Sequence, residues 1–442
     1  MTDPTQTALF DSAPTNGHAA RLGDDTEAEE RPGYQFVKRI GWIPEDWDVR
    51  ALRTAGRIVT GSTPATGNDV FYGGPYPFVG PGDLGGFKVV SGSDRMLSEA
   101  GLSQTRPVPA GSVLFTCISF AIGKTGQAGT LLATNQQINA VVPNEKHDGD
   151  FLYYLLTFLS GRIRRLAGIQ ATPILNKTDF GNVVLPLPPL PEQREIARVL
   201  GAWDRTLADL DALINAKRQR ARGLAQRLLT GRVRLPGFED RIPMRPLGDF
   251  FRHVSTRNKE RRDLTPLSCS KVHGIVPQSQ IFDKRIASDD TSNYKVVQRG
   301  DLVYDPMLLW DASIGFVDTV DEGVISPAYA TFHLNEKTAD RSFFRHFFNG
   351  HYMRHQYKVI SQGTNTRRRK AMAKDFLDVD ARVPPLDEQR QIAAVLNAAG
   401  AEIAAHEAER AALAAQKRGL MQRLLTGEVR VLPSSSTMEQ AL

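Results

Sequence analysis

Few residues in this sequence have the types and spacing that chemistry requires. Gly123-Lys124-Thr125 resembles the end of a phosphate-binding loop, but the first glycine of that motif would fall on Ile118. Neither His-Glu-x-x-His nor Cys-x-x-Cys occurs, and Cys117 and Cys269 are too isolated for a metal site or a disulfide framework. We therefore expect no catalytic residue, no metal site and two reduced, structural thiols.

Polar and basic clusters are better candidates for binding than for catalysis. Arg367-Arg368-Arg369-Lys370 is the densest basic run and is either a phosphate-binding segment or a solvated loop. Thr134-Asn135-Gln136-Gln137 could meet adenine or bond phosphate oxygens, although an ordinary polar turn explains it as well. Ser62 and Thr63 follow Gly61 in a tight turn whose amides and hydroxyls could face a phosphate.

An internal repeat dominates the chain. Pro188-Pro189-Leu190-Pro191-Glu192-Gln193-Arg194 recurs as Pro384-Pro385-Leu386-Asp387-Glu388-Gln389-Arg390, at an offset of 196 residues. Gln226-Arg227-Leu228-Leu229-Thr230-Gly231 recurs at the same offset, and 25 of the 47 positions from 188 to 234 are identical in the two copies. The chain is therefore a duplication.

Each copy predicts one long helix. Paired prolines precede it, acidic residues occupy its start, and Gly231 or Gly427 ends it. At roughly 38 residues and about 1.5 Å per residue, each helix should be about 57 Å long. Apolar residues recur in two seven-residue series offset by four, which is the seam of a coiled coil. We assign helix pairing to Ile196, Leu200, Trp203, Leu207, Leu210, Ile214, Leu224, Leu228, Ile392, Leu396, Ile403, Leu413, Leu420 and Leu424.

The second seam is weaker than the first, because His406, Arg410 and Lys417 interrupt it.

Outside the helices, Gly, Pro, Val and aromatic residues alternate with turn signals, which predicts two mixed α+β domains. We interpret four aromatic residues in them as core or rim packing: Phe71, Tyr72, Trp310 and Tyr329. The predicted organisation is a tail (1–33), a domain (34–187), a helical region (188–235), a second domain (236–383), a second helical region (384–431) and a flexible tail (432–442).

Charge and hydropathy narrow the class of protein further. The 442 residues include 55 Lys+Arg and 49 Asp+Glu, a net charge of +6, and residues 1–33 alone contribute −5. That acidic stretch predicts a disordered tail, and the basic remainder suits a polyanionic partner without requiring one. Because no long apolar run and no signal peptide occur, we expect a cytoplasmic protein without a membrane span.

Two variable halves alternating with two similar helices resemble the specificity subunit of a type I restriction-modification system. Ile40-Gly41-Trp42-Ile43-Pro44-Glu45-Asp46-Trp47 is similar to the family's entry into its first target-recognition domain, and Gly61-Ser62-Thr63-Pro64 to the turn that follows. The repeated Pro-Pro-Leu and Leu-Leu-Thr-Gly segments are similar to the boundaries of its conserved helical regions. The acidic tail and the charged second seam depart from the family pattern.

The resemblance implies a fold with two α/β target-recognition domains, separated by two long helices that form an antiparallel coiled coil with pseudo-twofold symmetry. It also implies a non-catalytic subunit that reads an asymmetric, bipartite site on double-stranded DNA. The implied partners are methyltransferase subunits, two in number, and restriction subunits. S-adenosylmethionine, ATP and Mg²⁺ would belong to those partners, and the chain itself would need no cofactor.

Two other classes of protein could share some of these features. A self-contained restriction-methylation enzyme would need an Asn/Asp-Pro-Pro-aromatic signature, whereas Pro-Pro occurs here only before leucine. A coiled-coil adaptor without DNA recognition would share the helices, and it remains the alternative. Such an adaptor would not require two large, divergent domains.

Overall fold

The computed structural model describes residues 31–37, 40–167, 173–271, 273–284, 286–361 and 370–431. Most of the two predicted tails therefore falls outside the described residues. The chain divides into two compact units: unit 1 joins Met1–Ala208 to Ala411–Leu442, and unit 2 is Asp209–Arg410. Within the described residues, no helix is both long and apolar enough to cross a membrane.

Two helices of 40 residues each, α4 (Leu190–Leu229) and α8 (Leu386–Leu425), contribute one half to each unit. In unit 2, Arg410 pairs with Asp211 and Lys217 with Glu402, so the sequence rises along α4 while it falls along α8. The halves in that unit are therefore antiparallel. All the residues that we assigned to helix pairing are buried or half-buried in the structure.

The charges that interrupt the second seam are neutralised by carboxylates of the other helix. Arg410 meets Asp211 at 2.9 Å in unit 2, and Lys417 pairs with Asp204 in unit 1. His406 instead contacts Glu409 of its own helix at 3.3 Å. Charged residues therefore occupy the seam without leaving Arg410 or Lys417 unpaired.

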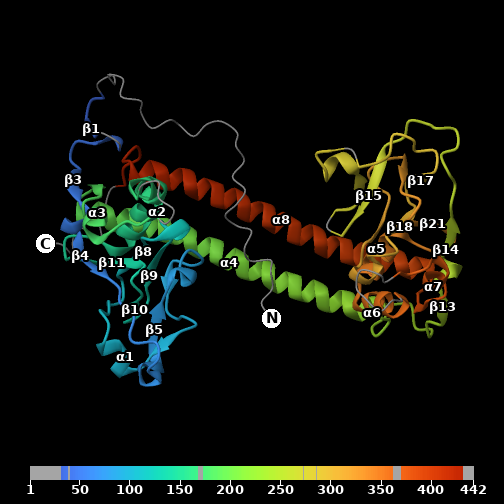
Figure 1. Cartoon of the computed structure of the whole chain (residues 1–442), viewed down its shortest axis with the longest axis horizontal. Coiled ribbons are helices and arrows are strands. Elements are labelled where there is room, and N and C mark those ends of the chain that lie inside the picture. Colours follow the sequence, from blue (N-terminus) through green and yellow to red (C-terminus); the bar gives the residue numbers. More distant parts are fainter. Residues whose placement is uncertain are drawn as a thin grey trace. The chain divides into compact units, whose positions relative to one another are not determined.

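The main sheet of unit 1 has the strand order β4-β11-β8-β9-β6, and α2 packs against it (Figure 1). A smaller sheet, β10-β5-β7, contains a parallel pair between β10 and β5. The elements of unit 1 before α4 are β1 (Tyr34–Val37), β2 (Gly41–Pro44), β3 (Asp48–Ala51), β4 (Gly56–Thr60), β5 (Tyr72–Val79), β6 (Val89–Val90), β7 (Met96–Leu97), α1 (Glu99–Ser103), β8 (Val113–Thr116), β9 (Thr125–Ala128), β10 (Ala133–Thr134), β11 (Ile138–Pro143), α2 (Gly149–Leu166), α3 (Lys177–Gly181) and β12 (Val184–Leu187).

Unit 2 repeats this plan with the strand order β14-β21-β18-β19, covered by α5 and α6. Its second sheet, β16-β15-β20-β17, again contains a parallel pair, between β15 and β20. Its elements between α4 and α8 are β13 (Met244–Pro246), β14 (Phe251–Val254), β15 (Pro266–Ser270), β16 (Gly274–Pro277), β17 (Lys295–Gln298), β18 (Leu302–Tyr304), β19 (Ile314–Phe316), β20 (Glu322–Ile325), β21 (Ala330–Leu334), α5 (Arg341–Asn349), α6 (His351–Ile360), α7 (Ala373–Leu377) and β22 (Asp380–Arg382). The α+β prediction and the duplication are confirmed.

The glutamine of each repeated motif fastens a helix start to its own domain. Gln193 accepts a hydrogen bond from the backbone N–H of Asp148, the N-cap of α2, at 2.9 Å. Gln389 accepts one from the backbone N–H of Asp340, the N-cap of α5, at 2.8 Å. Both glutamines are fully buried, so each α/β domain is tied to the first turn of the helix that follows it.

The glutamate of each motif forms an ion pair with an arginine beyond the end of the other helix. Glu192 accepts from Arg430 at 2.7 Å in unit 1, and Glu388 accepts from Arg234 at 2.6 Å in unit 2. The side chains of Glu192 and Glu388 are 7% and 0% exposed. We call these two pairs the clasps, because each joins one repeat to the other within a unit.

We expect Arg234→Ala to destabilise unit 2 far more than an ordinary surface substitution. It leaves the buried Glu388 carboxylate without its partner, which costs about 3–5 kcal/mol. Arg423→Ala is the control, because Arg423 and Glu428 are 55% and 59% exposed and such a pair contributes at most about 1 kcal/mol. Scanning calorimetry should show a large fall in melting temperature for Arg234→Ala alone. Equal melting temperatures would contradict the role of this clasp.

We expect Gly427→Ala and Gly419→Ala to change the stability of unit 1 in opposite directions. Gly427 has a φ of +70°, and a Cβ there would lie 2.3 Å from Cδ of Pro44, so the substitution should cost about 1–3 kcal/mol. A Cβ on Gly419, inside α8, would meet nothing within 4 Å, and alanine there should add up to about 1 kcal/mol. Thermal unfolding of both variants is the measurement, and shifts of the same sign would refute this prediction.

Candidate nucleic-acid interface

Five connecting segments of unit 1 meet at one end of its main sheet, where strands begin and end. Strands β4 and β8 end there, at Thr60 and Thr116, and β11 and β9 begin there, because the pairing is antiparallel. The segments are held together by backbone hydrogen bonds such as Ser62 N–H to Thr134 O at 2.9 Å and Leu175 N–H to Cys117 O at 2.8 Å. We call this set the loop edge of unit 1; it comprises residues 61–64, 80–83, 117–124, 134–137 and 173–176.

The structure brings two separately predicted segments together on this edge. Thr63 donates a hydrogen bond from Oγ1 to Oε1 of Gln136 at 2.7 Å, and both side chains are exposed. The approach is close, because a Cβ on Gly61 would lie 2.1 Å from the carbonyl oxygen of Asn135. Glycine is therefore required at this turn if the polar groups are to share one surface.

The remaining predicted residues of the edge differ in exposure. Asn135 and Gln137 are half-buried, and the Asn135 amide donates to Oε1 of Gln137 at 3.1 Å. Ser62 is also half-buried, whereas Thr134 is only 1% exposed and its hydroxyl has no hydrogen-bond partner among the described residues. Thr134 therefore lies in the interior below the edge, and the surface presents mainly Thr63 and Gln136.

Basic side chains border the loop edge of unit 1. Lys124 is exposed on the β8–β9 connection, where its Nζ lies 3.5 Å from the carbonyl oxygen of Pro81. A Cβ on Gly123 would lie 3.2 Å from Cβ of Ser160, so this connection adjoins the C-terminal turns of α2. Arg164 and Arg165 in the last turn of α2 are exposed as well. The edge thus combines amides, hydroxyls and cations, which suits a polyanion.

Unit 2 has an equivalent loop edge, at residues 255–258, 305–313, 326–329 and 370–372. Strands β14 and β18 end there, and β21 and β19 begin there. Lys370 is exposed on it, and the neighbouring Ala371 N–H donates to Pro306 O at 2.9 Å. The other predicted basic residues, Arg367, Arg368 and Arg369, lie outside the described residues.

Lys295 is buried beneath the loop edge of unit 2. Lys295 is 7% exposed and donates from Nζ to the carbonyl oxygen of Tyr329 at 2.6 Å. Burial, with a smaller contribution from the nearby Arg257, lowers the pKa of Lys295. Burial followed by Lys295 also lowers the pKa of His253. Lys295 therefore stabilises the turn at Tyr329. Tyr329 is half-buried, as are the other three aromatic residues that we interpreted as packing.

Both cysteines are buried in the described part of the chain. Burial raises the pKa of the Cys117 thiol to about 12 and that of Cys269 to about 11, so both stay protonated at neutral pH. Among these residues, no three His, Cys, Asp or Glu side chains are grouped as metal ligands would be.

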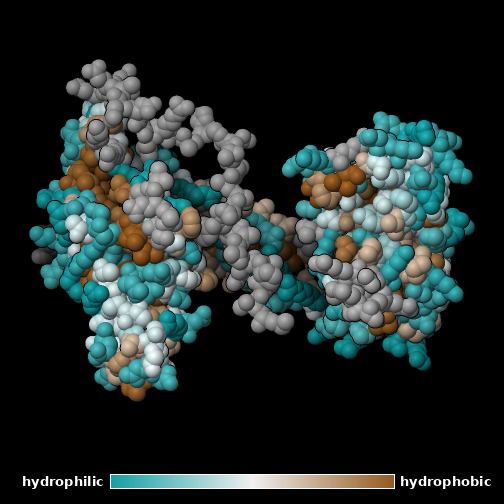
Figure 2. All heavy atoms as spheres, viewed as in Figure 1, coloured by the Kyte–Doolittle hydropathy of each residue, from teal (hydrophilic) through white to brown (hydrophobic). Residues whose placement is uncertain are grey.

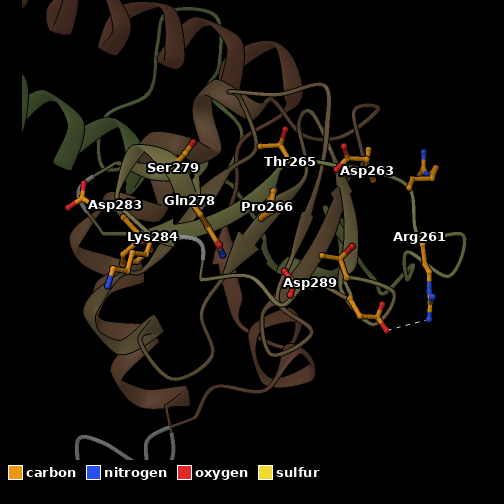
Figure 3. A pocket seen from close by; sticks show the side chains of 14 residues that line it. Arg261, Asp263, Thr265, Pro266, Gln278, Ser279, Asp283, Lys284 and Asp289 are labelled. Atoms are coloured by element: carbon orange, nitrogen blue, oxygen red, sulfur yellow. Dashed lines mark ion pairs between the residues drawn. The ribbon is translucent and has the colours of Figure 1, made fainter.

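A hollow of about 540 Å³ opens on unit 2 (Figure 3). It adjoins the loop edge, because Asn258 Nδ2 donates to Oγ1 of the lining residue Thr291 at 3.3 Å. Its lining includes three cations and four carboxylates, and Arg261 pairs with Asp290 across its rim at 3.5 Å. The carboxylates are Asp263, Asp283, Asp289 and Asp290. An excess of carboxylates repels phosphate, so the hollow does not extend the candidate interface.

Sequence reasoning missed the clasps and several residues of the loop edge. The clasps did leave a signal, because Glu192, Arg234 and their copies are polar residues kept in both repeats. Lys124 was considered only as part of a failed phosphate loop. Phe120 lies in an apolar run that reads as interior, and only the structure places its side chain in solvent.

A family model described as the type I restriction modification DNA specificity domain matches residues 44–217. That segment contains the first α/β domain from β3 to β12 and the first part of α4. It also contains the loop edge of unit 1, where the predicted polar residues gather.

Curated relatives that are named type I specificity subunits align with this chain over different lengths. The MjaIX specificity subunit of a type I restriction enzyme from Methanocaldococcus jannaschii is 31% identical over 186 residues, which is 41% of either chain. The MjaVIII specificity subunit from the same organism is 21% identical over 415 residues, or 88% of this chain and 94% of that one. The chain thus spans about two fifths of the first relative and nearly all of the second.

Two solved structures have a similar fold. An S subunit of a type I restriction-modification system from M. genitalium has a TM-score of 0.53 at 15% identity and covers 90% of this chain and 99% of its own. A chain from a study of type I system assembly and conformational transition has a TM-score of 0.57 at 17% identity, covering 88% and 99%. The chain is similar to the specificity subunits of type I restriction-modification systems, and residues 44–217 match the model of their DNA specificity domain.

Proposed function

We propose that this chain is the non-catalytic subunit that reads the DNA target of a type I restriction-modification system. The observation that carries the proposal is a contrast between the two units. Their sheets and clasps repeat, but their loop edges differ: Thr134-Asn135-Gln136-Gln137 stands before β11, whereas Ser326-Pro327-Ala328-Tyr329 stands before β21. A scaffold kept twice with divergent surfaces is what two different half-sites require.

The cations and the amides of a loop edge would have different tasks. Lys124, Arg164 and Arg165 would bind phosphates and position the duplex without reading its sequence. Gln136 and Asn135 would meet base edges, since a side-chain amide can pair bidentately with adenine. This division predicts separate effects of substitutions on affinity and on specificity.

The helices would set the distance between half-sites and carry the enzyme subunits. A helix of 40 residues is about 60 Å long, more than the roughly 34–36 Å that separates half-sites one DNA turn apart. Two similar helices can offer similar faces to two methyltransferase subunits, with restriction subunits joining that complex. In this proposal, S-adenosylmethionine, ATP and Mg²⁺ bind to those partners. An adaptor without DNA recognition remains the competing function, and it gives no reason for divergent loop edges.

We expect Gln136→Ala, in a host expressing the chain with its methyltransferase subunit, to change one half of the methylated sequence. The other half should stay the same, because the loop edge of unit 2 is untouched. Single-molecule methylome sequencing measures both halves at once. Glu145→Ala, at an exposed position beyond the opposite end of β11, is the control and should leave the mark intact. If no bipartite mark depends on this chain, the proposed function is wrong.

We expect Lys124→Ala to weaken binding to specific and nonspecific DNA by similar factors. Loss of one phosphate contact should reduce the slope of log affinity against log salt by about one. Lys146→Ala is the control, because Lys146 is exposed beyond the opposite end of β11. Fluorescence anisotropy across a salt series is the measurement. Equal slopes for both variants would remove Lys124 from the interface.

A further inference from the structure

Exposed apolar side chains interrupt the hydrophilic surface of both units (Figure 2). Two of the most exposed are aromatic residues of unit 1, Phe87 at 85% and Phe120 at 78% exposure. A folded chain gains nothing by holding such rings in water. Phe120 moreover stands on the loop edge that we assign to DNA.

The turn that carries Phe120 is held in an uncommon conformation. Ser119, just before it, has a φ of +63°, which is the left-handed region that residues other than glycine rarely adopt. Ser119 N–H donates to Pro173 O at 2.8 Å, and Ile122 N–H donates to Ser119 O at 3.2 Å. These bonds hold the backbone in a strained shape while the ring points away from the core, and such strain clusters at ligand-binding sites.

Phe87 and Lys124 lie beside this turn. Strand β6 pairs in parallel with β9, with Val89 opposite Gln127, so Phe87 is level with the start of β9. A Cβ on Gly85 would lie 3.5 Å from the side chain of Lys124. Lys124 therefore packs beside the segment that leads to Phe87, and it lies on the same β8–β9 connection as Phe120.

We propose that Phe120 is an apolar wedge that enters a base step of double-stranded DNA, with Lys124 on the adjacent phosphate. The proposal rests on the proposed function and specifies how that same edge meets its ligand. Apolar side chains inserted between base pairs unstack and bend the duplex, and phenylalanine, leucine and methionine serve in this way. The exposed Lys124 on the same connection favours DNA over an apolar protein surface as the occupant.

Unit 2 supports the proposal independently. Its equivalent connection, between β18 and β19, carries Met307 at 52% and Leu308 at 47% exposure. Ala312, one of the three described residues other than glycine with positive φ, lies in that connection at +63°. The sequences of the two connections differ, yet both place apolar side chains on the loop edge, in solvent. A wedge in each half-site needs apolar bulk rather than one residue type.

The test uses the full chain co-expressed with its methyltransferase subunit and a duplex bearing 2-aminopurine along the target. We expect the unsubstituted complex to raise 2-aminopurine fluorescence at one step of the half-site read by unit 1, because unstacking relieves quenching. Phe120→Ala should abolish that rise and weaken binding about tenfold, whereas Phe120→Leu should retain part of both. Leu131→Ala, 42% exposed beyond the far end of β9, is the control and should behave as the unsubstituted chain.

Each outcome decides a separate point. Unchanged fluorescence and affinity in Phe120→Ala would overturn the wedge while leaving DNA recognition intact. Loss of the methyltransferase subunit from the Phe120→Ala complex would also overturn it, by assigning the ring to a protein contact. If the unsubstituted complex discriminates no sequence at all, the proposed function fails instead. Since Phe120 contributes little to the core, an unchanged melting temperature should accompany the loss of signal.

Discussion

The structure of each unit depends on one buried carboxylate. The side chains of Glu192 and Glu388 are almost completely buried. A carboxylate can be buried in this way only when a cation and further hydrogen bonds replace its hydration. Glu192 accepts hydrogen bonds from Arg430 and from the indole N–H of Trp47, and Glu388 accepts hydrogen bonds from Arg234. Because the arginine always comes from the other repeat, neither repeat can complete a unit alone. The clasps therefore give a physical reason why the fold needs two copies of the repeat.

The same seven-residue motif also joins each domain to its helix. Next to the clasp glutamate, Gln193 or Gln389 accepts from the N-cap of α2 or α5, so one turn of helix anchors both the other repeat and its own domain. These contacts lie at one end of the sheet, and the loop edge lies at the other. Substitutions on the loop edge therefore leave the anchoring contacts intact. A scaffold divided in this way can change its target without losing its assembly.

The sequence was sufficient to predict the long helices, their seam and the α+β character of both halves, because repetition and heptad spacing are periodic signals. It could not reveal that Lys417 and Arg410 would be neutralised across the seam, since that depends on the register of two distant segments. The sequence also could not predict which apolar side chains are exposed. Phe120 looks like a core residue between Ile118 and Ile122, and only the turn at Ser119 directs it outward.

The two loop edges would read their targets by different chemistry. In unit 1 the exposed amide of Gln136 stands before β11, whereas the equivalent segment of unit 2 exposes Pro327 and Ala328, which offer no side-chain hydrogen bond. Polar side chains in unit 2 instead follow β14, where Thr256 and Arg257 are exposed. Base recognition in the second half-site would then fall on a different connection of the same sheet. In the proposed function, divergence of this kind would move the residues that contact bases as well as change them, so the residues that read one half-site would not identify those that read the other.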